Sequence, residues 1–444
     1  KRGHEDAVRD ILAKWDLTAA VIGEVIAEPV YRVTEGDRVV AEFPGARLVT
    51  DCPVYTPAAR ESDEVRALRE ADVLAIPERP EERDPVWTLT QLLSSPTSAS
   101  KRWVYEQYDS TVRTNTVVGP GAGDAAVVRL RGTDRAIAMK TDCNARYVYL
   151  DPRVGGRIAV AEAARNVACV GARPMAITNC LNFGNPQRPE VFYQFREAVA
   201  GMGDACRALG TPVTGGNVSL YNQNPSGAIY PTPVVGMVGV VDALEHITRS
   251  GFHQDGDAIV LLGDPTLELG GSEYLARIHD VVAGAPPHCN LERERAIIES
   301  LLESIRAGVV TSAHDTSEGG LAVAIAECAI GDRERLVGAE IDLSTWRELP
   351  LRCLLFGEAQ GRVLVGTTDP ARVLAIAERH GVPAWVIGRV QANSGVLAIR
   401  VGDRVISAPL ARLARAYHEA IPSAMQHEPV EAAVLEQHPQ PASI

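Results

Sequence analysis

The chain has 444 residues, of which 46% are hydrophobic and 23% are charged. Because this is about three times the length of a typical domain, we expect two or more domains with sizeable cores. The composition excludes disordered and fibrous proteins. The formal net charge is −13, and no long Lys/Arg block is present, so we expect no nucleic-acid partner.

No apolar run approaches the roughly 20 residues that span a bilayer. The first residues also lack the apolar core of a signal peptide. We therefore expect a cytoplasmic protein with no membrane partner. The eight cysteines include no C-x-x-C pair and lie mostly in apolar segments, which favours reduced, structural thiols over zinc ligands or disulfides.

Three short segments near the N-terminus recur about 365 residues later in the same order. One match could arise by chance, but three in register indicate an internal repeat. We therefore expect residues 1–58 to be the end of a first copy, with the rest of that copy upstream of Lys1. The matched pairs are VIGEV at 21–25 with VIGRV at 386–390, GDRVV at 36–40 with GDRVI at 402–406, and ARL at 46–48 with ARL at 411–413.

The rest of the chain divides by composition and periodicity. Residues 59–90 are rich in Glu, Arg and Pro, and we expect a linker with one short helix. Strands alternate with helices over 91–246 and again over 247–421, which predicts an α/β (α+β) fold, and 422–444 resemble a flexible tail. The expected strands are 125–130, 136–140, 175–178, 257–262 and 362–366, and the expected helices are 156–169, 191–209, 292–307 and 320–329.

Two polar segments that follow expected strands are candidate ligand loops. In Thr214–Ser219 (TGGNVS), paired glycines allow backbone N–H groups to approach an oxyanion, while Asn and Ser offer oxygens for a cation or phosphate. A tight turn with Asn in the left-handed region is an equally consistent interpretation. Asn179–Pro186 (NCLNFGNP) lies at a strand end where an α/β protein often has its ligand crevice, although loop capping alone would also explain it.

Further polar clusters are less specific. Gly119–Asp124 (GPGAGD) and Lys140–Arg146 (KTDCNAR) could together hold Mg²⁺ and phosphate, or form a hairpin turn with solvated charges. Their order does not fit a P-loop. His314 beside Asp315 suggests acid–base chemistry, but no third partner is identifiable, and the following Thr, Ser and Glu could simply cap a helix.

Taken together, these segments resemble the second half of the small type of phosphoribosylformylglycinamidine synthase, in the aminoimidazole ribonucleotide synthetase superfamily. The resemblance covers roughly residues 1–420 in collinear order. The segments that carry it are 104–109 (VYEQYD), 112–117 (VRTNTV), 141–147 (TDCNARY), 160–166 (VAEAARN), 181–186 (LNFGNP), 215–221 (GGNVSLY), 230–237 (YPTPVVGM) and 269–274 (LGGSEY).

The resemblance implies a fold of two tandem copies arranged like a dimer fused in one chain. Each copy has an N-domain with a mixed sheet and flanking helices, followed by a C-domain of α/β sandwich type. Here the second copy would be complete, with its N-domain at 91–246 and its C-domain at 247–421, and the first copy truncated.

The resemblance also implies a reaction in purine biosynthesis. Formylglycinamide ribonucleotide is converted to formylglycinamidine ribonucleotide: ATP phosphorylates the amide oxygen, and ammonia then displaces phosphate, with Mg²⁺ neutralising the phosphates. None of the eight cysteines is in a nucleophile-elbow context, so ammonia would come from a separate glutaminase subunit, with a small bridging subunit as a further partner.

Site residues follow from the matched motifs. Gly216 would contact ATP, Asn217 would bind Mg²⁺ and Ser219 would contact the substrate. Asn179 stands at an ATP-contacting position that is typically Asp in relatives, which puts the strength of that contact in doubt. Lys140 and Asp142 resemble a degenerate pseudo-site that holds a structural nucleotide or nothing.

The family's catalytic residues lie in the first copy, so the resemblance implies that none of them is among these 444 residues. We therefore expect an ATP-dependent ligase that is inactive as this fragment alone. The alternative is a non-catalytic nucleotide-binding scaffold half of such an enzyme.

Overall fold

The computed structural model describes residues 1–426, which fall into two units that divide between Thr56 and Pro57. Within this range no helix is long and apolar enough to cross a membrane. The expected tail from residue 427 onward lies outside the described residues. Residues 422–425, which we expected to belong to that tail, are the last turn of helix α14.

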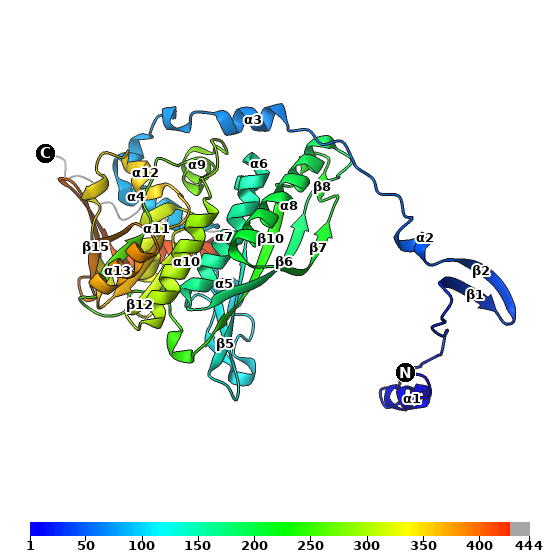
Figure 1. The fold of residues 1–444 in the computed structure, drawn as a ribbon. Helices are drawn as coiled ribbons and strands as arrows, with labels where there is room; N and C mark the ends of the chain where they lie inside the picture. Colours follow the sequence, from blue (N-terminus) through cyan, green and yellow to red (C-terminus); the bar gives the residue numbers. More distant parts are fainter. Residues whose placement is uncertain (427–444) are drawn as a thin grey trace. The chain divides into compact units, whose positions relative to one another are not determined.

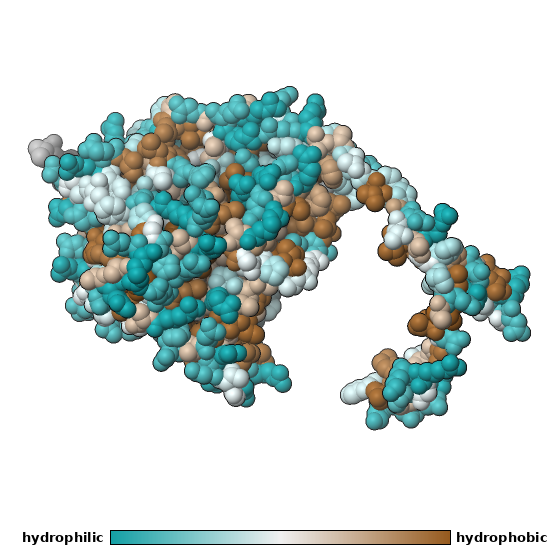
Figure 2. All heavy atoms as spheres, in the orientation of Figure 1, coloured by the Kyte–Doolittle hydropathy of each residue, from teal (hydrophilic) through white to brown (hydrophobic). Residues whose placement is uncertain are grey.

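The first unit, residues 1–56, contains helices and one antiparallel hairpin but no buried side chain. Ile22 is 99% exposed and Val25 is 103% exposed, and Figure 2 shows hydrophobic side chains along the surface of this unit. The unit therefore has no hydrophobic core of its own. Its elements are α1 (Glu5–Ala13), β1 (Val30–Glu35), β2 (Arg38–Pro44) and α2 (Ala46–Val49).

The second unit contains a six-stranded mixed sheet in the order β3-β4-β5-β10-β6-β7. Neighbouring strands are antiparallel except for β6 and β7, which run parallel at one edge. A small separate hairpin, β8–β9, follows β7. The strands are β3 (Thr116–Val118), β4 (Ala126–Leu130), β5 (Arg135–Asp142), β6 (Arg173–Asn182), β7 (Val213–Ser219), β8 (Gln223–Asn224), β9 (Gly227–Ala228) and β10 (Thr232–Val241).

Among residues 1–426, helices cover only one face of this sheet. Helix α7 (Pro152–Cys169) begins where Asp151 accepts a hydrogen bond from the Val154 N–H, and it packs against β5, β6 and β10. Helix α8 (Pro189–Leu209) lies beside α7 and ends at Gly210 in the left-handed conformation (Figure 1). The opposite face, which we call the outer face, is open: it exposes Met139, Met175 and Val238.

A seven-stranded sheet in the order β12-β14-β11-β15-β13-β16-β17 follows, and both of its faces are buried. On β11, Ile259 and Leu261 belong to one core cluster, while Val260 and Leu262 belong to the other. This continuous apolar run is typical of a strand covered on both sides. The strands are β11 (Ala258–Leu262), β12 (Val310–Asp315), β13 (Gly338–Asp342), β14 (Val363–Thr367), β15 (Ala384–Gln391), β16 (Val396–Val401) and β17 (Arg404–Pro409).

The two faces of the seven-stranded sheet have different roles. One face packs, through α10 and α13, into the same core as the six-stranded sheet and α7, so the two sheets share a core. The other face is covered by the remaining helices of this region. The helices are α9 (Glu273–His279), α10 (Leu291–Arg306), α11 (Gly320–Ile330), α12 (Leu351–Phe356), α13 (Pro370–Arg379) and α14 (Leu410–Met425).

The segment that we expected to be a linker is part of the packed structure. It contains α3 (Asp63–Glu70) and α4 (Pro85–Leu93), and α4 is buried against α9, α11 and α14. The buried Tyr274 hydroxyl also donates a hydrogen bond to the Glu82 carboxylate of this segment. The linker prediction was wrong here because the many charged residues hide an apolar series. That series is Val65, Val73, Val86, Leu89 and Leu92.

Helices α7 and α8 approach so closely that glycines are required between them. A Cβ on Gly201 would lie 2.9 Å from the Arg153 carbonyl carbon, and one on Gly156 would lie 3.2 Å from the Met202 nitrogen. These contacts are with backbone atoms, which cannot move without shifting a helix.

We therefore expect Gly201→Ala to lower the free energy of unfolding by about 2 kcal/mol, because the helices must separate. Gly203→Ala, two residues away on α8, is the control. Its Cβ would meet only the flexible Arg207 side chain, so higher helix propensity should make it neutral or stabilising by up to about 1 kcal/mol. Urea titrations would measure both changes, and equal effects would contradict the packing argument.

Candidate functional site

The predicted binding residues Asn179, Gly216, Asn217 and Ser219 all lie on the parallel strand pair β6–β7. Asn179 is paired with Gly216, and Ser219 with Asn182. We expected loops at 214–219 and 179–186, but β7 covers 213–219 and β6 extends to residue 182. The loop prediction failed because Gly and Asn are poor strand formers, whereas pairing with β6 keeps this edge extended.

The strand alternation divides these residues between the two faces of the sheet. Asn179 follows the buried Ile177 on the helix-covered face, and its partner Gly216 lies on the same side. Asn217 is paired with Cys180 on the outer face, where the Asn217 Nδ2 lies 3.8 Å from the Cys180 Sγ. The candidate nucleotide contacts and the candidate metal ligand are therefore adjacent in sequence but on opposite faces.

Glycine is required at position 216 but not at position 215. A Cβ on Gly216 would lie 2.6 Å from the Asn179 carbonyl oxygen and closer still to its side-chain oxygen, whereas a Cβ on Gly215 would meet nothing within 4 Å. Gly216 thus allows the Asn179 side chain to lie directly against the β7 backbone.

A hydrogen-bonded turn fixes Ser219. Its Oγ lies 3.2 Å from the Asn222 Oδ1, and the Asn222 Nδ2 donates to the carbonyls of Phe183 at 2.9 Å and Ser219 at 2.7 Å. Tyr221 between them has a φ of 68°. Asn222 was not among the residues predicted from the sequence, although its position three residues after Ser219 is typical of side chains that close a turn.

The predicted pseudo-site residues lie in the same sheet. Asp142 and Asn179 are both paired with Val235 of β10, one on each side, so they are two strand spacings apart, about 10 Å. The Lys140 Nζ lies 3.9 Å from the Asp142 Oδ2. Burial raises the pKa of Asp142 to about 7; Lys140 opposes this shift, and the nearby Glu318 adds to it.

Next to this pair is a buried charge network centred on Arg165 of α7. Its guanidinium donates to Asp315 at 2.7 Å, to Glu294 at 2.7 Å and to Gln360 at 2.9 Å. Burial alone would lower the pKa of Arg165, but Asp315 and Glu294 hold it well above its usual value. Arg165 was not among the residues predicted from the sequence. The signal available was one arginine among Ala163, Ala164 and Val167 in a helix otherwise suited to the core.

His314 also has partners that the sequence did not indicate. Its Nδ1 lies 2.6 Å from the Asp124 Oδ1 and its Nε2 lies 3.2 Å from the Glu327 Oε2, while the other Asp124 oxygen accepts the Asp315 N–H at 2.7 Å. Burial by itself would raise the pKa of Asp124 and lower that of His314. The ion pair reverses both shifts, so the pKa of His314 lies well above its ordinary value. Asp124 therefore anchors His314, where we had considered a Mg²⁺ or phosphate ligand.

The donor groups limit what a metal site here could be. Within residues 1–426, no group of three or more His, Cys, Asp or Glu side chains could hold a metal ion. Near Asn217 the oxygens come from neutral amides and hydroxyls. Mg²⁺ commonly takes one or two protein oxygens and completes its shell with water and phosphate oxygens, so Asn217 fits as one ligand of a nucleotide-bound Mg²⁺ but not as a stand-alone site.

Comparison with known proteins gives the family. Residues 122–241 match the AIR synthase related protein N-terminal domain, and residues 254–399 match the corresponding C-terminal domain. The chain is 49% identical over 428 residues to phosphoribosylformylglycinamidine synthase subunit PurL of Moorella thermoacetica, and 46% identical over 439 residues to that of Chlorobaculum tepidum. Together the two domain matches cover more than half of the chain, which therefore belongs to the AIR synthase related family.

Each of these alignments covers 96% of this chain but 57% of the relative, so the chain spans little more than half the length of these relatives. Solved structures share the fold at low sequence identity. T. maritima PurL complexed with FGAR has a TM-score of 0.62 at 22% identity, covering 78% of this chain and 55% of that one. The complex with ATP has a TM-score of 0.58 at 22% identity, covering 74% and 52%.

Because its pKa is raised, protonated His314 stabilises the fold. This contribution is complete below the unfolded pKa of about 6.5 and is lost as pH rises through the folded value. We expect His314→Gln to cost about 3 kcal/mol at pH 6, since it leaves Asp124 buried without a cation, and the difference from the unsubstituted chain to shrink as pH rises. Unfolding free energies between pH 6 and 9 would test this, with His253→Gln at an exposed position as control. A pH-independent difference would show that His314 is neutral.

Proposed function

We propose that this chain supplies part of an ATP-dependent carbon–nitrogen ligase that makes formylglycinamidine ribonucleotide from formylglycinamide ribonucleotide and glutamine-derived ammonia in purine biosynthesis. The observation that carries the proposal is the 49% identity to a PurL subunit across nearly the whole chain. The solved complexes of T. maritima PurL with FGAR and with ATP support the same substrates.

The strand pair β6–β7 would provide the ligand contacts. Because β7 is the edge strand, a nucleotide lying along its free edge would contact Gly216 and Asn179 on one face, and its Mg²⁺ would take one oxygen from the Asn217 amide on the other face. Mg²⁺, when bound, neutralises phosphate charge. Ser219, held by the Asn222 turn, would contact the ribonucleotide substrate. The neutral amide of Asn179 contributes no charge to this site, so phosphate binding would depend on the metal and on backbone N–H groups.

The pseudo-site would have a structural role. The charges around Lys140 and Asp142 are partly compensated within the protein, because Arg165 engages Asp315 and Glu294, and Lys140 lies beside Asp142. Burial and neighbouring carboxylates still raise the pKa of Asp142. We propose that this cluster holds the two sheets together and takes no part in catalysis.

A tandem repeat would explain two exposed surfaces. At repeat-equivalent positions, Ile22 and Val25 are fully exposed, whereas Ile387 and Val390 are buried. Residues 1–58 would therefore be the end of a first C-domain. The open outer face of the six-stranded sheet would likewise pack against the N-domain of that first copy, which would also supply the catalytic residues.

The remaining parts of the proposal concern the domains, the partners and the location. Residues 91–246 and 247–421 would be the N- and C-domains of the second copy. Ammonia would come from a separate glutaminase subunit with a small bridging subunit, in keeping with a solved assembly described as PurLQS from Thermotoga maritima. The enzyme would act in the cytoplasm.

Nucleotide contact at β7 can be tested with neighbouring glycines. In the complete enzyme, this chain joined to the proposed first copy, Gly216→Ala should weaken MgATP binding at least about tenfold, a cost of about 1.4 kcal/mol, because the new methyl group displaces Asn179. Gly215→Ala should leave the affinity unchanged. Calorimetric titration with MgATP would compare them, and equal affinities would remove β7 from the nucleotide site.

The role of Asn217 predicts a loss of turnover. In the complete enzyme, Asn217→Ala should lower kcat with ATP, formylglycinamide ribonucleotide and ammonia at least about 100-fold. The reason is that the Mg²⁺ that neutralises phosphate charge would lose one oxygen ligand. Asn393→Ala, on an exposed turn, is the control. Full activity of N217A would favour the alternative, in which this half is a non-catalytic scaffold.

A further inference from the structure

We propose that Asn222 makes the Ser219 hydroxyl a hydrogen-bond acceptor, so that Ser219 binds an N–H or O–H group of the ribonucleotide substrate and not its phosphate. Substrate contact at Ser219 is part of the proposed function, on which this assignment rests. Asn222 is then a positioning residue: it acts through Ser219 and selects which chemical group of the substrate Ser219 contacts.

Asn222 is held in place by three neighbouring segments of the chain. Its backbone N–H donates to the Phe183 carbonyl at 3.1 Å, just after the end of β6, and its own carbonyl accepts the Ile229 N–H at 3.0 Å. Its Nδ2 donates to the carbonyls of Phe183 at 2.9 Å and Ser219 at 2.7 Å. Because a carbonyl can only accept, the amide nitrogen must face these two groups. The Asn222 Oδ1 therefore faces the Ser219 Oγ, at 3.2 Å.

This arrangement uses the one proton of the Ser219 hydroxyl. An amide oxygen accepts hydrogen bonds and donates none, so the Ser219 hydroxyl donates to the Asn222 Oδ1. Within residues 1–426, Asn222 is the only hydrogen-bond partner of this hydroxyl. The lone pairs that remain on the Ser219 Oγ can accept an N–H or O–H group. A phosphate group presents acceptor oxygens and does not match them.

Ser219 shares the outer face of the sheet with the candidate Mg²⁺ ligand. Ser219 and Asn217 are two positions apart on β7, so their side chains point to the same side of the sheet, roughly 7 Å apart. Asn217 is exposed and Ser219 is partly buried. A ribonucleotide contact beside a nucleotide-bound Mg²⁺ suits a reaction that moves phosphate from ATP to the substrate amide. The amide N–H and ribose O–H groups of formylglycinamide ribonucleotide are donors of the required kind.

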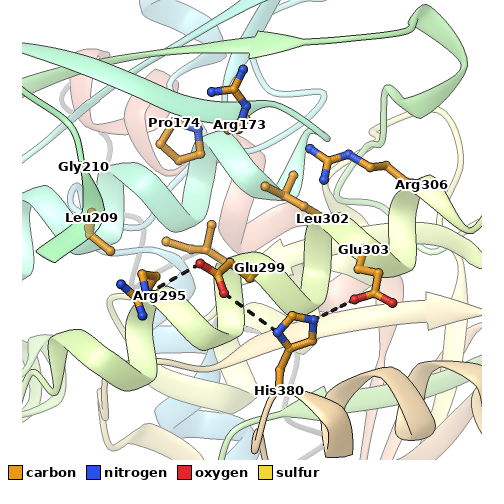
Figure 3. Close-up of a pocket in the computed structure, with 11 residues that line it drawn as sticks. Arg173, Pro174, Leu209, Gly210, Arg295, Glu299, Leu302, Glu303, Arg306 and His380 are labelled. Carbon is orange, nitrogen blue, oxygen red and sulfur yellow. Dashed lines mark hydrogen bonds and ion pairs between the residues drawn. The ribbon is translucent and has the colours of Figure 1, made fainter.

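The polar groups of a pocket elsewhere in the second unit are, in contrast, paired with one another. This pocket of about 460 Å³ is lined by residues of β6, α8, α10 and α13 (Figure 3). Its His380 ring lies 2.7 Å from Glu303 and 3.9 Å from Glu299, and Glu299 lies 3.6 Å from Arg295. These charges compensate each other and indicate no class of ligand. Ser219 differs, because its single hydrogen bond leaves it with lone pairs and no proton to donate.

A cycle of single and double substitutions would test the role of Asn222 in the complete enzyme, this chain joined to the proposed first copy. We expect Asn222→Ala to raise the KM for formylglycinamide ribonucleotide about tenfold, the scale of one lost hydrogen bond, and to leave the KM for ATP and for ammonia unchanged. In the Ser219→Ala background, the same substitution should change this KM less than about twofold, because its effect passes through the hydroxyl.

Asn224→Ala is the matched control. Asn224 lies two residues further along the same segment and also closes a turn, by accepting the Ser226 N–H at 2.9 Å. It makes no contact with Ser219, so its substitution should leave every KM unchanged.

The group that Ser219 binds can be identified with the dephosphorylated substrate. Ser219→Ala should lower kcat/KM by the same factor, about tenfold, for formylglycinamide ribonucleotide and for the corresponding ribonucleoside, because both carry the N–H and O–H donors. A loss confined to the ribonucleotide would assign Ser219 to the phosphate and overturn the proposal. This measurement does not depend on how well the Asn222→Ala variant folds.

Two further results would overturn the role of Asn222. An equal rise in KM with and without the Ser219 hydroxyl would show that Asn222 only shapes the turn. A rise in the KM for ATP or ammonia would show that the substitution disturbs the whole site. In both cases the unsubstituted enzyme still turns over, and the proposed function stands. Absence of turnover in the unsubstituted enzyme would instead contradict the proposed function, and the assignment of Asn222 with it.

Discussion

The buried guanidinium of Arg165 is the constraint on which the second unit depends. It extends from α7, beneath the six-stranded sheet, to carboxylates of β12 and α10 and to the amide of Gln360, all from the region of the seven-stranded sheet. A buried charge needs its partners in place, and removing one typically costs about 3–5 kcal/mol. The network therefore favours the relative position of the two sheets that brings these partners to Arg165. The shared apolar core also holds the sheets together, but the hydrophobic effect is non-directional and does not by itself fix their relative position.

Local patterns in the sequence predicted most of the elements of the second unit. Helix α8 matches the apolar stripe of 191–209 and its terminal Gly210, and strand β11 matches the apolar run near 258–262. Both patterns depend only on residues that are close in sequence. The edge strand β7 was not predictable in this way. Its glycines are extended only because β6 lies beside them, and that pairing joins residues about 37 positions apart.

The candidate site was predictable in its residue types but not in its geometry. Asparagines and glycines at 179 and 215–217 marked the strand pair, yet their division between two faces depends on register, which a sequence does not display. The partners of His314 show the same limit. Asp315 is its neighbour in sequence, but Asp124, 190 positions away, is its neighbour in space. The linker prediction for residues 59–90 was wrong for a different reason. Charged residues dominate the composition of this segment, but a few aliphatic residues determine how it packs.

The paired glycines of β7 also have a consequence for the behaviour of the chain in solution. Proteins usually protect a sheet edge with lysine, proline or bulky charged side chains, which prevent another strand from adding to it. Residues 214–219 (TGGNVS) carry none of these, and the contact with Asn179 excludes a side chain at position 216. The glycine that would suit this strand to ligand contact thus leaves an edge strand without these protecting side chains, and a foreign strand that paired with it would compete with a bound ligand.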